Sequence, residues 1–186
     1  MELLIILGLI VGAVLFFIVI YNRLIALREK RKNAFSDIDV QLKQRHDLIP
    51  NLVNVVKGYA AHEKSVLENL TEARSNAMRQ STIDSKAAAE TGLGAAMMRL
   101  FAVAENYPDL KADQNFQRLQ AELSDIENKI AAARRFFNNA TNELNTAIQQ
   151  FPAVLIARPF GFKEENFFEM TTEEKQMAEK PPEVQF

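Results

Sequence analysis

Apolar residues recur at steps of three and four between positions 24 and 78, which is the spacing of one buried face on a helix. The positions of this stripe are Phe35, Ile38, Leu42, Ile49, Leu52, Val56, Tyr59, Val66, Leu70, Ala73 and Ala77. A straight helix of that length would reach roughly 80 Å, well beyond the diameter of a small domain, so we expect it to bend or break. The weak points are Pro50, which cannot donate to the helical ladder, and Gly58, which costs about 1 kcal/mol relative to alanine.

Two further helices are predicted beyond a polar interruption at residues 81–85. Ser85 begins the first of them, and its apolar positions end at Pro108. Asp113 is expected to cap the next helix, in which apolar residues alternate strictly at steps of three and four. These positions are Phe116, Leu119, Leu123, Ile126, Ile130, Ala133, Phe137, Ala140, Leu144, Ala147 and Phe151. Such a heptad seam predicts coiled-coil packing in a left-handed bundle.

After Phe151 the helical pattern stops. Residues 153–168 are apolar but interrupted by Pro159 and Gly161, which predicts an extended segment folded back over the bundle. Residues 169–186 are polar and are expected to be disordered. The predicted fold class is therefore all-α, an antiparallel up-and-down four-helix bundle with long helices over residues 23–168.

The first 22 residues differ in kind from the rest. Residues 3–20 contain no charged side chain, and a helix of this length nearly spans the ~30 Å hydrocarbon layer of a membrane. A cleaved signal peptide is the competing interpretation, but only Met1 and Glu2 precede the apolar run, so the usual basic segment is missing. A buried core helix is the other alternative. We expect residues 1–22 to form a transmembrane anchor.

A collar of basic residues follows the apolar run and is opposed only by Glu29. Its members are Arg23, Arg28, Lys30, Arg31 and Lys32. The positive-inside rule predicts a single-pass protein of the bacterial inner membrane with its N-terminus outside and its helical domain in the cytoplasm. The collar is also expected to attract anionic lipid headgroups, although a solvated helical face would show the same charges.

The remaining composition argues against most chemistry. The net charge is −2, so nothing in it indicates a nucleic-acid partner. The absence of cysteine excludes disulfides, thiolate zinc sites and a cysteine nucleophile. His46 and His62 lie far apart, and the sequence after His62 lacks the second histidine of a zinc-protease motif. We predict no catalytic, cofactor-binding or metal-binding residue, and no enzyme.

One short stretch, residues 44–52 (QRHDLIPNL), holds the strongest candidate site. Asp47 lies four residues after Lys43, as in an exposed charge ladder that also includes Asp39. His46 lies at the edge of the apolar stripe, and Pro50 leaves the carbonyl of His46 without its helical donor. Arg45 is a possible neutralising donor. The stretch is interpreted as a stabilised kink, or as a docking notch for a partner formed by Arg45, His46 and Pro50.

Residues 21–74 closely resemble the LemA family of bacterial membrane-anchored proteins, above all in IDVQLKQRHDLIPNLV. The closing FPAVLIARPFGF from Phe151 and the residues Phe167 to Glu169 resemble the family's C-terminal signature. Phe35 departs from the family, which commonly has tryptophan there. The resemblance implies a transmembrane helix followed by a helical bundle, no established enzymatic activity, and an association with membrane proteolysis and envelope stress.

The functional hypothesis is a membrane-anchored scaffold or adaptor. It would bind lipid through its N-terminal helix and recruit an unknown protein partner at the inner membrane, in a role such as envelope quality control. The alternative is a small-molecule-sensing or enzymatic domain with a pocket near His46. Homo-oligomerisation along exposed seams is compatible with the first hypothesis.

Overall fold

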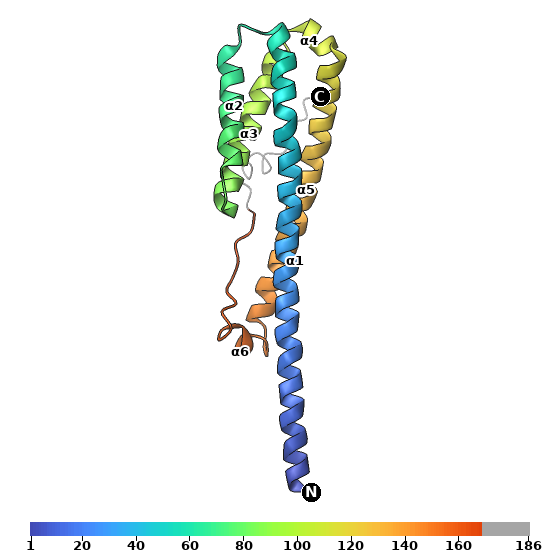
Figure 1. The fold of residues 1–186 in the computed structure, drawn as a ribbon, viewed down its shortest axis with the longest axis vertical. Coiled ribbons are helices and arrows are strands. Elements are labelled where there is room, and N and C mark those ends of the chain that lie inside the picture. The colour runs from blue at the N-terminus through green and yellow to red at the C-terminus, as the bar shows by residue number, and fades with distance from the viewer. Residues whose placement is uncertain (169–186) are drawn as a thin grey trace, which may run out of the picture. The chain divides into compact units, whose positions relative to one another are not determined.

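The structure is a computed structural model and describes residues 1–168 (Figure 1). Its elements are α1 (Glu2–Tyr59), α2 (Lys64–Met78), α3 (Ile83–Ala104), α4 (Pro108–Ala112), α5 (Gln114–Gln149) and α6 (Val154–Ala157). No strand occurs within these residues, and the predicted all-helical fold class is confirmed. The disorder predicted for residues 169–186 lies outside the described part of the chain.

Helix α1 is longer than the sequence pattern predicts. It continues through Pro50 and ends at Tyr59, immediately after Gly58, where a short connection leads to α2. The break expected between Pro50 and Gly58 is therefore at the glycine end. At its other end α1 contains an 18-residue window that is apolar enough to cross a membrane, and none of that window is buried.

The described chain divides into two compact units. Residues 1–38 and 132–167 form the terminal unit, and residues 39–131, together with Phe168, form the central unit. Helices α1 and α5 contribute to both. Because the predicted up-and-down bundle extends over both units, its complete arrangement stays a prediction.

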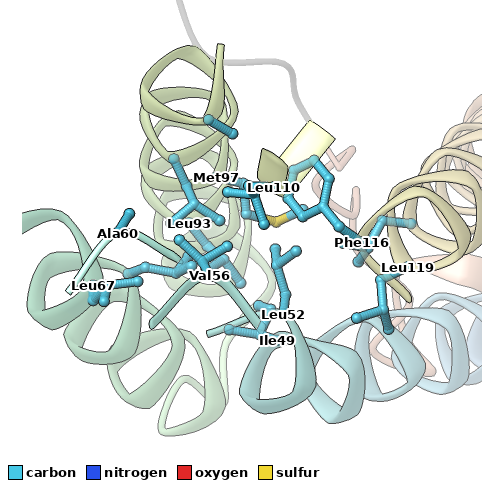
Figure 2. Close-up of a cluster of buried hydrophobic side chains, with 14 of the residues drawn as sticks. Ile49, Leu52, Val56, Ala60, Leu67, Leu93, Met97, Leu110, Phe116 and Leu119 are labelled. Atoms are coloured by element: carbon cyan, nitrogen blue, oxygen red, sulfur yellow. The ribbon is translucent and has the colours of Figure 1, made fainter. Parts of the chain in front are cut away.

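The central unit is organised around one apolar core to which five helices contribute. Figure 2 shows its side chains converging from α1 to α5, among them Ile49, Leu52, Val56, Leu67, Leu93, Met97, Leu110, Phe116 and Leu119. Burial of each large apolar side chain stabilises the fold by about 1.5–3 kcal/mol before chain entropy is counted. The predicted stripe thus supplies the α1 side of this core, although Tyr59 is exposed.

Local signals set the helix boundaries in the central unit. The Oδ1 atom of Asp113 accepts hydrogen bonds from the amides of Asn115 (2.8 Å) and Phe116 (2.9 Å), so the predicted cap of α5 is confirmed. Helix α3 begins at Ile83 rather than Ser85, because the Oγ1 atom of Thr82 accepts from the Ser85 amide at 3.2 Å.

The terminal unit has its own core, and the end of the predicted seam differs there. This core consists of Leu24, Leu144, Ala147, Ile148, Ile156, Ala157 and Phe162. The prediction that the seam continues to Phe151 is wrong: α5 ends at Gln149 and Phe151 is 80% exposed. The segment predicted to be extended contains α6 and then a turn at Gly161, whose φ of +74° favours glycine.

Candidate functional site

A carboxylate with no exposed surface lies inside the central unit. Glu90 on α3 accepts hydrogen bonds from Nη2 of Arg45 and, at 2.7 Å, from Nε2 of His46, and its side chain is 0% exposed. Nη1 of Arg45 also donates to Oε1 of Glu127 on α5 at 2.6 Å. These four residues, the ionic cluster, connect α1, α3 and α5.

The ionic cluster is charged at neutral pH. Burial by itself would raise the pKa of Glu90, but the hydrogen bond from His46 and the charge of Arg45 hold that pKa below its ordinary value. Burial would lower the pKa of Arg45, yet Glu127 and Glu90 raise it. An ionised carboxylate only accepts hydrogen bonds, so Nε2 of His46 holds the proton that faces Glu90.

The carbonyl that Pro50 leaves without a helical donor is bonded from a neighbouring helix. Nε of Arg74 on α2 donates to the His46 carbonyl oxygen at 2.7 Å. This bond replaces the missing ladder bond, and α1 passes Pro50 without ending. The sequence indicated Arg45 as a possible donor, but the donor is Arg74, because Arg45 points to the two glutamates.

The charge ladder predicted around Asp47 is present in part. Nζ of Lys43 lies 2.7 Å from Oδ2 of Asp47, and this hydrogen bond lowers the pKa of Asp47. Asp39 pairs instead with Lys86 of α3, at 2.5 Å. The structure thus separates Asp47, on the exposed face, from Arg45 and His46, which are buried.

Sequence reasoning missed Glu90, Glu127 and Arg74. A signal for Glu90 was present, since it is the single charged residue in the run AAAETGLGAAMM, residues 87–98. A lone carboxylate in an otherwise uncharged stretch of a helix indicates a buried ionic partner. Its partners lie 44 and 45 positions earlier in the chain, and no local pattern indicates them.

An open groove of about 560 Å³ lies between α1 and α2, and we call it the α1–α2 groove. Its lining comprises Val53, Lys57, Ala61, Lys64, Leu67, Glu68, Thr71, Glu72, Ser75 and Arg79. Pro50 is exposed and precedes Val53 by three residues and Lys57 by seven, so these three share one face of α1. The docking role predicted for Arg45, His46 and Pro50 stays a prediction, in which Pro50 alone is accessible.

A pocket at His46 was the alternative interpretation. His46 does not line the α1–α2 groove, nor a cavity of about 330 Å³ between α2 and α3 or one of about 440 Å³ in the terminal unit. No group of three or more histidine, aspartate or glutamate side chains suited to a metal ion occurs within residues 1–168.

The basic collar lies in the terminal unit and divides into two sets. Lys30 pairs with Glu143 at 2.7 Å, and Arg31 pairs with Glu165 at 3.2 Å and donates to the carbonyl of Asn166 at 2.9 Å. Arg23, Arg28 and Lys32 are exposed. Part of the collar therefore stabilises the fold, and the contact with lipid headgroups that we expect of the exposed part stays a prediction.

The fold and the exposed apolar window define a membrane-associated all-helical protein. The LemA family model matches residues 34–186, and the chain belongs to the LemA family. The magnetosome protein MamQ of Magnetospirillum gryphiswaldense is 27% identical over 80% of this chain and 64% of MamQ. MamQ 1 of Paramagnetospirillum magneticum is 26% identical over the same shares, and Protein LemA of Metamycoplasma hominis is 27% identical over 70% of this chain and 60% of its own length.

Proposed function

We propose that the protein is a single-pass adaptor of the bacterial inner membrane that recruits a protein partner to the cytoplasmic surface. The observation that carries the proposal is the α1–α2 groove, which is open and is lined by apolar side chains together with charged ones. The family resemblance implies a part in envelope quality control, and an adaptor could take this part by recruiting a partner, without catalysing a reaction itself.

The shape of the groove favours a helical partner. Its lining residues recur along α2 from Lys64 to Arg79, so the groove extends over the whole of that helix, about 22 Å. Val53 and Leu67 supply apolar surface, and the lining also contains charges of both signs. An amphipathic helix binds such a groove with its apolar side chains inward, as in other helix-in-groove complexes.

The ionic cluster supports this interpretation over catalysis. Glu90 has no exposed surface and both of its hydrogen-bond donors come from the same chain, so no substrate atom can reach it. The cluster instead fixes the position of α1, the helix that contributes Val53 and Lys57 to the groove.

Filling the groove tests the adaptor proposal. A photo-crosslinking residue at Glu72, in the full chain expressed in its membrane, should give one defined protein adduct. Ser75→Trp should abolish this adduct because Ser75 lines the groove. Ser65→Trp is the matched control, since Ser65 is an exposed serine on α2 outside the lining, and it should leave the adduct unchanged. Equal adduct yields in the two variants would refute docking in the groove.

The topology has a separate test. Exposed Arg23, Arg28 and Lys32 follow the apolar window, and the positive-inside rule retains such a segment in the cytoplasm. A reporter fused after Phe186 should be active only in its cytoplasmic form. Periplasmic reporter activity would reverse the proposed orientation and leave the groove experiment unaffected.

A further inference from the structure

Three large apolar side chains within ten residues of one another are exposed on the segment after α5. Phe151 is 80% exposed, Leu155 is 65% exposed and Phe160 is 51% exposed. From the same segment, Ile156 and Phe162 are buried in the core of the terminal unit. The segment therefore packs some of its apolar side chains into the fold and leaves three large ones exposed, whereas apolar residues that are exposed by chance are scattered singly.

Two ring contacts place this segment against the end of the apolar window. The ring centroid of Phe160 lies 5.5 Å from that of Phe17 and 5.1 Å from that of Tyr21 (Figure 1 shows α6 beside α1). Phe17 lies three residues inside the apolar run that ends at Ile20, which is about 4.5 Å along a helix axis. When α1 spans a bilayer, Phe160 consequently reaches the boundary between acyl chains and headgroups.

The polar residues around the segment suit the same position. Arg158 and Lys163 are exposed on either side of Phe160, and the guanidinium of Arg28 lies 5.2 Å from the Phe162 ring centroid. Aromatic rings at the acyl boundary with basic groups at headgroup level are typical of segments that lie in a membrane interface.

We propose that residues 151–160 form a second membrane contact, in which Phe151, Leu155 and Phe160 insert into the acyl boundary of the bilayer beside α1. The occupant of this apolar face is lipid. The inference rests on the proposed spanning of the bilayer by α1, and it adds that the terminal unit lies directly on the membrane surface.

The sequence contains no tryptophan, so single tryptophans report on single positions. Leu155→Trp and Phe160→Trp in the full chain, reconstituted into phosphatidylcholine–phosphatidylglycerol vesicles, should show blue-shifted emission. Lipids brominated near the top of the acyl chain should quench both. Met98→Trp is the control, because Met98 is exposed on α3 in the central unit, and it should emit at longer wavelength without quenching.

A fourth variant separates this inference from the proposal on which it rests. Phe16 is exposed within the apolar run, four residues before the end of that run at Ile20, and Phe16→Trp reports whether α1 is in the bilayer. Quenching of Phe16→Trp without quenching of Leu155→Trp and Phe160→Trp would overturn the second contact and leave the anchor intact. Absence of quenching in all three would overturn both. Circular dichroism of each variant checks that its helix content is unchanged.

Discussion

Replacement of Glu90 by glutamine tests how much the ionic cluster stabilises the central unit. The carboxamide has the same shape but no charge. Its oxygen can accept from one of the two donors, but its NH2 group then faces the other donor and cannot accept. A hydrogen bond to a charged group contributes about 1.5–3 kcal/mol, and removing one partner of a buried ion pair costs about 3–5 kcal/mol. Because Arg45 still has Glu127 as a partner at 2.6 Å, we expect the free energy of unfolding to fall by about 3 kcal/mol, the low end of that range.

The matched control is Glu127→Gln, which removes the same charge from the other side of Arg45. The Glu127 side chain is 45% exposed, and exposed ion pairs contribute only about 0–1 kcal/mol. Urea denaturation of the full chain in detergent micelles, followed by far-UV circular dichroism, gives the free energy of unfolding of each variant. Equal losses for the two glutamines would contradict the view that burial makes Glu90 the important partner.

The stability difference between wild type and Glu90→Gln should depend on pH. Burial opposes ionisation of Glu90, yet His46 and Arg45 together lower its pKa in the folded protein below the ordinary value of 4.5. The unfolded chain has the ordinary pKa, so this contribution to stability is complete above that value and is lost as pH falls through the folded pKa. The stability difference between wild type and Glu90→Gln should be constant above about pH 6 and shrink in acid. A difference that persists in acid would refute an ionised Glu90.

Two further predictions concern the His46 carbonyl and the turn at Gly161. Arg74→Leu should lower the free energy of unfolding by about 1–3 kcal/mol, because the His46 carbonyl then lacks a donor. The loss should be smaller in a Pro50→Ala background, where the amide of residue 50 can donate to that carbonyl. Additive losses in the double variant would refute this account. Gly161→Ala should cost about 1–2 kcal/mol at its positive φ, whereas Gly94→Ala within α3 should stabilise by about 0.5–1 kcal/mol, as thermal denaturation can measure; a neutral Gly161→Ala would contradict the turn.

The parts of the fold that the sequence predicts well are those set by near neighbours. The spacing of Leu52 and Val56 fixes which face of α1 is buried, and the Asp113 side chain caps α5 through amides two and three positions away. The end of α5 is also set by near neighbours, but the periodic apolar pattern continues to Phe151 and so predicted a longer helix. Pro152 disfavours helical backbone at Phe151, which therefore leaves the helix.

The candidate site depends on contacts that a single helix does not contain. The rule for proline correctly identified the carbonyl of His46 as the group that loses its donor, but Arg74 lies 28 positions later and reaches it from α2. Arg45 was recognised as a nearby cation, although its partners come from α3 and α5. Side chains that meet across helices are positioned by packing, and a periodic pattern does not specify which of them will meet.

The buried carboxylate of Glu90 also determines which alignment of helices is acceptable. The buried face of α3 includes small or adaptable side chains such as Ala87 and Met97, which specify the alignment of the helix only weakly. A shift of one turn, about 5.4 Å, would separate Glu90 from both donors and leave its charge buried without a partner. Near-native packings in which α3 has slipped along α1 are thus rejected electrostatically, where hydrophobic contacts alone would tolerate them.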